Sequence, residues 1–495
     1  MDTWRLRGSG EGRLAHSTLA LRRRPRAANG VVIACLVSLG GCGAKTSLPP
    51  TDDDADSGRG IGSRRDRDRD ERPSGAGGAA PDPPCSLEIA GDPLVAADFA
   101  EGNAGSPHLV AVESGVDGPA TLVLQATSQD ANFWHPELRL SRWGIGADWP
   151  GGAVVEQPFT LAGYDAHAAG RIGFLPGGRV GVAWFRGDEA AGLPSGLKFR
   201  PLEPKSWALG DEAFVDPKGE GVYSIAPRKG HPDTQWAITY RGLLPDLSVE
   251  TRIAVVNARA ELVVPPIVIA GARDYPGLAA ETVSTGDGWL SAVAFADCVT
   301  TDSACDDDAV VVFAVEAGLT DAGREPTSAL LPRARFPVAA PGTVPRRVSL
   351  ARDGDWVWLA WSEARPDDDL APRRIVLAAV NAAGEVAVEP RVIAQGVVSV
   401  SVHVAAGPDG PVVVWGEPGD PAASPEQVGA GSFVVHHERA SAAPEATRIA
   451  TTALGYGPGT PAIELQDPRS VVVSWTSSLP GALRTGVWLS RLDCR

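Results

Sequence analysis

One pattern of strands recurs along most of this chain, and it limits the fold more than composition does. From residue 106 onward, an apolar strand that ends near an aromatic or small residue appears seven times. The copies read TLVLQATS at 121–128, RVGVAWFRG at 179–187, TQWAITYRG at 234–242, WLSAVAFAD at 289–297, WVWLAWSEA at 356–364, PVVVWGEP at 411–418 and SVVVSWTSS at 470–478. If Ala126, Trp184, Thr239, Phe295, Trp361, Trp415 and Trp475 are equivalent, successive copies are 54 to 66 residues apart. Such a period indicates one supersecondary unit per copy, packed against its neighbours.

Each unit has the same internal order, which the copy between residues 347 and 394 illustrates. A first strand is followed by a tight turn at Asp353-Gly354-Asp355, and then by the tryptophan-bearing strand. A longer loop, a third strand, a turn at Ala383-Gly384 and a fourth strand complete the unit. No stretch shows a sustained helical period. We therefore predict an all-β chain that folds as a seven-bladed β-propeller of four-stranded blades. Two β-sandwiches are the competing architecture, but they do not predict seven evenly spaced units.

The N-terminus has the layout of an export signal. The basic segment RRRPR at 22–26 precedes the apolar run Val31–Leu39, which is too short to span a membrane and leads into Gly-Gly-Cys42. Over residues 1–42 this arrangement resembles the signal peptides of bacterial lipoproteins. The resemblance implies that residues 1–41 are removed and that Cys42 is acylated, so that acyl chains attach the protein to a membrane. Gly43 stands where enteric bacteria place an Asp to retain lipoproteins at the inner membrane. We therefore expect a cell-envelope protein, lipid-anchored at the outer membrane and facing the periplasm or the surface.

Residues 42–84 contain almost no large apolar side chains and include the alternating run RRDRDRD at 64–70. Such a segment cannot bury enough surface to fold, so we predict a disordered tether that precedes a propeller domain at 85–495. The chain carries a formal net charge of −16, which opposes binding to phosphate backbones. We expect a monomer that does not bind nucleic acid.

Four cysteines remain after Cys42 and the signal peptide are set aside, and an even number in an exported protein suggests disulfides. The last repeat holds only three strands, and residues 86–98 can supply its missing outer strand. Antiparallel pairing would then place Cys85 beside Cys494, and a disulfide there would close the ring. Cys298 and Cys305 form the second predicted pair, a staple within one loop. A zinc site is the alternative, although the chain has no C-x-x-C pair.

In a propeller, the loop after the second strand of each blade lies on the same face as the connections between blades. Here those loops are long and acidic, so this face is the candidate binding face. Its predicted members are Asp297, Asp306, Asp307, Asp308, Glu363, Asp367, Asp368, Asp369 and Glu417. These carboxylates could hold Ca²⁺ or receive a basic partner, or they could be solvated surface. No EF-hand loop is present.

The recurring tryptophans at 184, 361, 415 and 475 are predicted to be core wedges between blades, whereas Trp134, Trp143 and Trp149 lie outside that register and are candidates to stack on a sugar. Catalytic motifs are absent: there is no G-x-S-x-G, H-E-x-x-H or phosphate-binding glycine loop. His436-His437-Glu438 resembles a metal motif, but adjacent residues of a strand point to opposite faces.

Two hypotheses follow from these patterns. The first is a non-enzymatic lipoprotein whose propeller presents a binding or assembly face to a protein or glycan. The second is an exported polysaccharide hydrolase or lyase that uses loop carboxylates. Arg, His and two carboxylates in the central channel would favour the enzyme, and a channel lined by Ala, Val and Ser would favour the binding protein.

Overall fold

The protein is represented by a computed structural model. The stretches that it describes are 85–97, 103–104, 108–112, 120–128, 137–144, 154–162, 170–174, 179–186, 195–203, 208–229, 234–245, 249–273, 279–286, 288–295, 308–316, 332–365, 373–397, 401–417, 432–439, 443–450, 461–467, 469–478 and 485–495. The predicted signal peptide, the acylation site Cys42 and the tether at 42–84 lie outside these residues, and so do Cys298 and Cys305.

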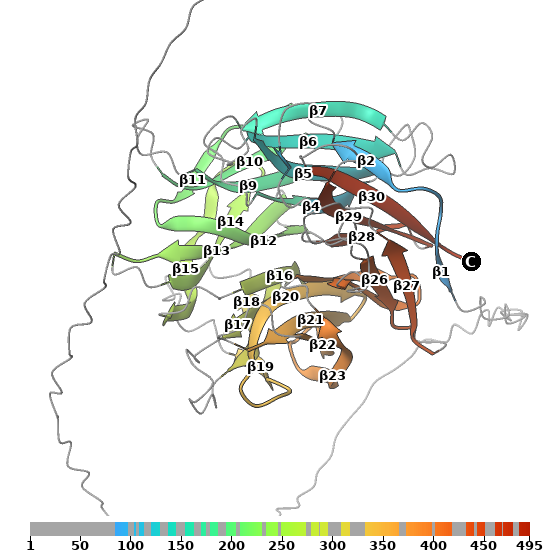
Figure 1. Cartoon of the computed structure of the whole chain (residues 1–495). Coiled ribbons are helices and arrows are strands. Elements are labelled where there is room, and N and C mark those ends of the chain that lie inside the picture. The colour runs from blue at the N-terminus through green and yellow to red at the C-terminus, as the bar shows by residue number, and fades with distance from the viewer. Residues whose placement is uncertain are drawn as a thin grey trace, which may run out of the picture. The chain divides into compact units, whose positions relative to one another are not determined.

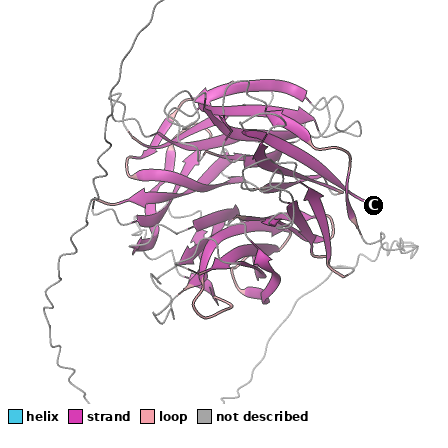
Figure 2. Ribbon diagram, in the orientation of Figure 1, coloured by secondary structure: helices cyan, strands magenta, loops and turns pink. Residues whose placement is uncertain are grey.

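The regular elements of the described residues are all β-strands (Figure 2). None of these residues belongs to a helix with the length and apolar character that crossing a bilayer requires.

The strands form seven antiparallel sheets, which we number as blades in chain order. Blade 1 contains β3 (Asn103–Ala104), β4 (His108–Val112), β5 (Ala120–Ser128), β6 (Glu137–Gly144) and β7 (Val154–Ala162). Blade 2 contains β8 (Arg171–Phe174), β9 (Val180–Arg186), β10 (Gly196–Leu202) and β11 (Ala213–Asp216). Blade 3 contains β12 (Gly219–Lys229), β13 (Thr234–Leu243), β14 (Val249–Asn257) and β15 (Leu262–Arg273).

The remaining blades have the same order from the inner to the outer strand. Blade 4 contains β16 (Ala279–Ser284), β17 (Gly288–Phe295), β18 (Ala309–Glu316) and β19 (Pro332–Pro337). Blade 5 contains β20 (Val344–Asp353), β21 (Trp356–Ala364), β22 (Arg373–Asn381) and β23 (Val386–Val397). Blade 6 contains β24 (Val402–Gly407), β25 (Gly410–Glu417), β26 (Ser432–His437) and β27 (Glu445–Ala450). Blade 7 contains β28 (Ala462–Asp467), β29 (Ser470–Ser478) and β30 (Thr485–Cys494), together with β1 (Leu87–Ile89) and β2 (Leu94–Ala97).

The first strands of the blades surround a common axis (Figure 1). Strand β4 contacts β8, and contacts continue in order through β12, β16, β20, β24 and β28, which contacts β4 again. The ring is therefore closed, and the predicted seven-bladed β-propeller is confirmed. A closed ring leaves no inner sheet edge open to unwanted pairing.

The two ends of the domain meet in blade 7. Strands β1 and β2 both pair antiparallel with β30, so the N-terminal segment supplies the outer strand that the last repeat lacks (Figure 1). Leu87 lies opposite Cys494, and Cys85 forms a disulfide with Cys494 across a sequence separation of 409 residues. The predicted disulfide between Cys85 and Cys494 is confirmed. Cross-linking so long a segment restricts the unfolded chain strongly, which favours the folded ring.

Buried tryptophans fill the spaces between blades. Trp184, Trp361, Trp415 and Trp475 are each at most 3% exposed, as expected for core wedges. In blades 3 and 4 this role falls to tryptophans outside the predicted register. Trp236 donates from Nε1 to the carbonyl of Gly173 in blade 2, and Trp289 donates to Ala226 in blade 3. Indole rings thus join neighbouring blades by packing and by a hydrogen bond.

Candidate functional site

The inner strands enclose a cavity of about 420 Å³ along the axis of the ring. Residues of six inner strands, β8, β12, β16, β20, β24 and β28, line it. Apolar and small side chains form much of the wall, including Ile172, Phe174, Pro227, Val283, Ala406 and Leu465. A cavity of this size falls within the range of small-molecule sites in proteins.

Four polar residues gather toward one end of this channel, and we call them the channel cluster: Arg171 on β8, Glu281 on β16, Arg347 on β20 and His403 on β24. Glu281 and His403 line the cavity itself, and the arginines lie one or two residues before the segments that line it. In the ladders the four lie opposite residues at or beyond the middle of each blade's second strand: Arg171 opposite Ala183, Glu281 opposite Ala292, Arg347 opposite Ser362 and His403 opposite Val414.

This register places the channel cluster toward one face of the ring. The cluster lies nearer to the face at which the second strands end than to the face at which they begin. Two other charged residues line the cavity farther along the axis, Arg352 opposite Val357 and Glu464 opposite Val472. They lie closer to the opposite mouth, because their partners come earlier in the second strands.

Arg171 is held in place by backbone oxygens. Its Nε donates to the carbonyl of Tyr223 at 2.9 Å, and its Nη1 donates to the carbonyl of Gly170 at 3.0 Å. Burial and, to a smaller extent, the like charge of Arg347 lower its pKa from 12.5 to about 10, although Glu281 acts in the opposite direction. The guanidinium is therefore fixed, charged and close to a second cation.

Glu281 is the carboxylate of the channel cluster and joins two blades. Its Oε2 accepts the backbone N–H of Leu350 at 3.0 Å, and Ser349 also bonds to it. Burial raises the pKa of Glu281 from 4.5 to about 7, although these bonds and Arg171 favour the charged form. A carboxyl with such a pKa exchanges a proton near neutral pH.

Arg347 and His403 have no partners of this kind. Within the described stretches, neither side chain makes an ion pair or a hydrogen bond, and Arg347 is exposed. Burial, together with the like charges of Arg171 and Arg347, lowers the pKa of His403 from 6.5 to about 3. The imidazole is therefore neutral at pH 7, with one ring nitrogen free to donate and the other free to accept.

The structure corrects the prediction for two members of the acidic face. Glu363 and Asp308 are each 1% exposed. Both oxygens of Glu363 accept the N–H of Ala339, and Oε1 also accepts the indole N–H of Trp361. Burial raises the pKa of Glu363, and these donors offset part of the effect. Glu363 stabilises the packing between blades 4 and 5 and is not a loop acid.

Most of the remaining predicted residues of the acidic face are not described. Asp297, Asp306, Asp307, Asp367, Asp368 and Asp369 lie outside the described residues. Glu417 is the last residue of β25 and lies opposite Ser432 in the ladder. No group of three metal-binding side chains occurs within the stretches that the structure describes. The prediction of a Ca²⁺ site in these loops stays a prediction.

Two other sequence candidates have structural roles. Trp143 is 5% exposed and donates to Ser141, so it packs in blade 1 and is not available to stack on a sugar. Trp134 and Trp149 lie outside the described residues. His437 is 1% exposed, whereas the ring of His436 contacts Glu438 at 3.1 Å.

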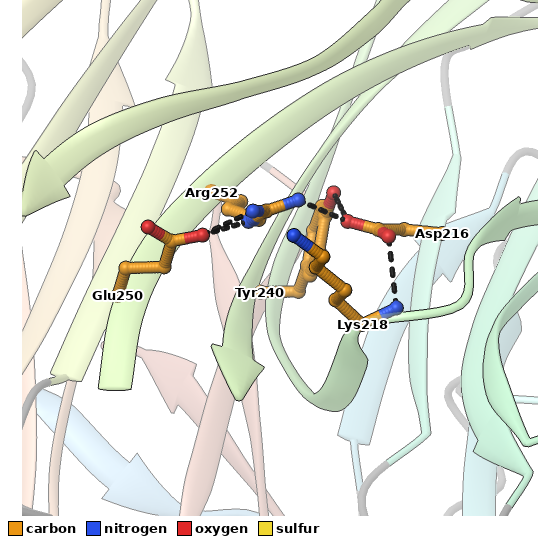
Figure 3. Close-up of polar contacts among 5 residues, drawn as sticks. All are labelled: Asp216, Lys218, Tyr240, Glu250 and Arg252. Atoms are coloured by element: carbon orange, nitrogen blue, oxygen red, sulfur yellow. Dashed lines mark hydrogen bonds and ion pairs between the residues drawn. The ribbon is translucent and has the colours of Figure 1, made fainter. Parts of the chain in front are cut away.

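A second polar cluster lies between blades 2 and 3, and we call it the interblade cluster: Asp216, Tyr240, Glu250 and Arg252 (Figure 3). Asp216 accepts the hydroxyl of Tyr240 at 2.6 Å, Nη1 of Arg252 at 2.9 Å and the backbone N–H of Lys218 at 2.9 Å. Arg252 also pairs with Glu250. Burial lowers the pKa of Arg252, but the bonds to Glu250 and Asp216 outweigh this effect and raise it. Burial and the bond to Asp216 raise the pKa of Tyr240 well above its usual value.

Comparisons with known proteins identify no family for this chain. No protein-family model matches it, and no curated protein sequence is similar to it. Among solved structures, a protein of unknown function from Dyadobacter fermentans is 11% identical, covers 83% of this chain and 99% of its own, and superposes with a TM-score of 0.45. An α-L-arabinanase from Penicillium chrysogenum is 10% identical with the same coverage and a TM-score of 0.41. The NanB sialidase from Streptococcus pneumoniae is 10% identical, with a TM-score of 0.41, and covers 81% of this chain and 70% of its own. These similarities carry no argument about the activity of this chain.

Proposed function

We propose that this protein is a lipid-anchored envelope protein whose propeller binds a ligand in its central channel without transforming it. The observation that carries the proposal is the channel cluster, where His403 lines a cavity of about 420 Å³ and Arg347 lies two residues before the lining residue Ser349, both without partners in the described part of the chain. Donors beside a cavity that have no protein partner are available to a ligand. A glycan or a short segment of a protein partner is small enough to enter.

Two features support a location in the envelope. The lipoprotein-like signal sequence that ends at Cys42 predicts export and acylation. By analogy with enteric bacteria, Gly43 after the cysteine supports placement at the outer membrane. The disulfide between Cys85 and Cys494 is consistent with an oxidising compartment outside the cytoplasm. The net charge of −16 argues against nucleic acid as the ligand.

A second candidate, an exported polysaccharide hydrolase or lyase, is favoured by one specific observation. The channel holds Arg, His and the carboxylates Glu281 and Glu464, and Glu281 has a pKa of about 7, which suits a general acid or base. This composition meets the criterion given above for an enzyme, with the catalytic acids on inner strands and not in the loops. Glu281 and Glu464 lie toward opposite ends of the channel, however, and Ala, Val and Ser also line it, so the binding protein is our first proposal. Release of new reducing ends or of unsaturated products from envelope polysaccharides would favour the enzyme over the binding protein.

A channel-filling variant tests the binding proposal. Ala406 lines the cavity, so Ala406→Trp should abolish binding in a glycan array or in ligand capture from envelope extracts. Ala382→Trp, in the exposed turn after β22, is the matched control and should bind like the unaltered protein. Equal binding by both variants would contradict a channel site. Labelling with palmitate, compared between the unaltered chain and Cys42→Ser, tests the anchor separately.

A further inference from the structure

The channel cluster contains more positive than negative charge, which is unusual for this chain. Arg171 and Arg347 face a single carboxylate, Glu281, and Arg347 lies close enough to Arg171 to lower the pKa of that guanidinium. Nothing in the described residues neutralises Arg347. Two guanidinium groups that repel each other beside the cavity are stabilised by an anion placed between them.

Geometry and charge favour a carboxylate as that anion. A guanidinium presents a planar fork of N–H donors that matches the two oxygens of a carboxylate. Arg171 is already oriented by two backbone carbonyls, so little side-chain freedom is lost when it binds. With Glu281 ionised, the four side chains of the cluster carry a net charge of +1, which a single carboxylate balances. A doubly charged phosphate would be repelled by Glu281.

The neutral imidazole of His403 adds a requirement for hydroxyl groups. It lines the same cavity, and its ring nitrogens can donate one hydrogen bond and accept another. A hydroxyl group both donates and accepts, so it satisfies such a ring. A ligand with a carboxylate, hydroxyl groups and the bulk of one or two sugar rings fits the charges, the donors and the volume of the channel.

We propose that the channel cluster binds an acidic sugar residue, whose carboxylate lies between Arg171 and Arg347 and whose hydroxyl group bonds to His403. This inference rests on the proposed function, because it names the class of ligand that the channel takes.

Isothermal titration of the full-length protein with the trimers of galacturonate and glucuronate tests the inference. The matched neutral probes are the methyl esters of the same trimers, which keep the size and hydroxyl groups and remove the charge. At least one acid should bind, and its ester should bind at least tenfold more weakly. Arg347→Gln should weaken binding of the acid by about 10- to 100-fold, as charge-assisted hydrogen bonds are worth about 1.5 to 3 kcal/mol.

Arg346→Gln is the control for charge, because this neighbouring arginine, at an irregularity in the β20 ladder, bonds to the carbonyl of Arg365 and does not belong to the channel cluster. It should bind the acid like the unaltered protein. His403→Asn, which keeps a donor and an acceptor, should retain more affinity than His403→Ala. Far-ultraviolet dichroism and thermal midpoints establish that each variant is folded.

The outcomes separate this inference from the proposed function. If neither acid binds, or if the esters or Arg347→Gln bind equally well, the acidic-sugar inference is overturned. In that case a ligand that Ala406→Trp excludes would still support a channel that binds something else. If Ala406→Trp leaves all binding unchanged, the proposed function fails as well.

Discussion

The interblade cluster and the channel cluster use the same kinds of side chain in opposite ways. In the interblade cluster, Asp216 accepts three hydrogen bonds and is 3% exposed, and Arg252 is paired with two carboxylates (Figure 3). In the channel cluster, two arginines share one carboxylate, and Arg347 has no partner among the described residues. The first arrangement is complete without a ligand and stabilises the fold. The second leaves donors beside a cavity without protein partners in the described part of the chain, which is the arrangement expected of a binding site.

The largest predicted effect comes from opening the interblade cluster. Asp216→Ala would leave Arg252 and the hydroxyl of Tyr240 without their main acceptor, and should lower the free energy of unfolding by about 3 to 5 kcal/mol. The matched control, Glu203→Ala, breaks an ion pair with Arg179 in which the glutamate side chain is 41% exposed and the arginine side chain 48% exposed. It should lower the free energy of unfolding by at most about 1 kcal/mol. Denaturation by guanidinium at pH 7 measures both. Equal costs would contradict the structural role of the cluster.

Glu281→Gln should change how the stability of the protein depends on pH. Because the pKa of Glu281 is raised to about 7 in the folded state, the folded protein holds a proton that the unfolded chain releases above about pH 4.5. The stability that this proton contributes is complete below pH 4.5 and is lost as the pH rises to 7. The variant should therefore gain about 2 to 3 kcal/mol relative to the unaltered protein between pH 4.5 and 8. A difference that does not change with pH would show that Glu281 ionises normally.

His403→Asn should protect the protein against loss of stability at low pH, whereas Glu281→Gln acts at high pH. The pKa of His403 is lowered to about 3 in the folded state, so the unfolded chain takes up a proton below about pH 6.5 that the folded protein refuses. The unaltered protein loses stability as the pH falls from 6.5 toward 3, and the variant should lose about 2 kcal/mol less by pH 5. Unfolding curves at pH 5 and pH 7.5 provide the measurement. Parallel losses in the two proteins would argue against a neutral, desolvated imidazole.

The smallest change in stability is predicted for Arg347→Gln in the channel cluster. The same substitution in the interblade cluster, Arg252→Gln, is its matched comparison. Removing Arg347 breaks no ion pair among the described residues and relieves repulsion with Arg171, so stability at pH 7 should change by about 0.5 kcal/mol or less. Arg252→Gln, in contrast, leaves Asp216 and Glu250 without their shared cation and should cost about 3 kcal/mol or more. A large loss for Arg347→Gln would show that this residue supports the fold and not a ligand.

Much of the fold could be predicted because its signals are local and repeated. In blade 5 the tight turn at Gly354, which has a φ of 58°, joins two strands as predicted, and an apolar second strand is present in each of the seven blades. The pairing of Cys85 with Cys494 followed from counting strands in the last repeat. Glu363 is the exception. It was predicted to be an exposed loop acid, but its carboxylate is buried and accepts the backbone N–H of Ala339 and the indole N–H of Trp361.

The channel cluster was not predicted, because its members carry no motif. Arg171 and His403 are separated by more than two hundred residues, and each lies in a short strand that looks like an ordinary blade strand. One signal was available: a charged residue or a histidine occupies an inner-strand position within RIGF, AAETVS and VHVAAG, where the other side chains are apolar or small. Without the ring, nothing indicates that these positions face one another.

The sequence by itself determined the number of blades, the clasp between the two ends and the tryptophan wedges, because turn chemistry, strand periodicity and repeat length act within one unit or between adjacent units. Only the tertiary structure decided which charges meet. Closing seven units into a ring brings one face of every inner strand to a common axis, so residues that are distant in the chain share one small volume. In that volume their charges interact strongly, whereas the same residues in an open sheet would be screened by water.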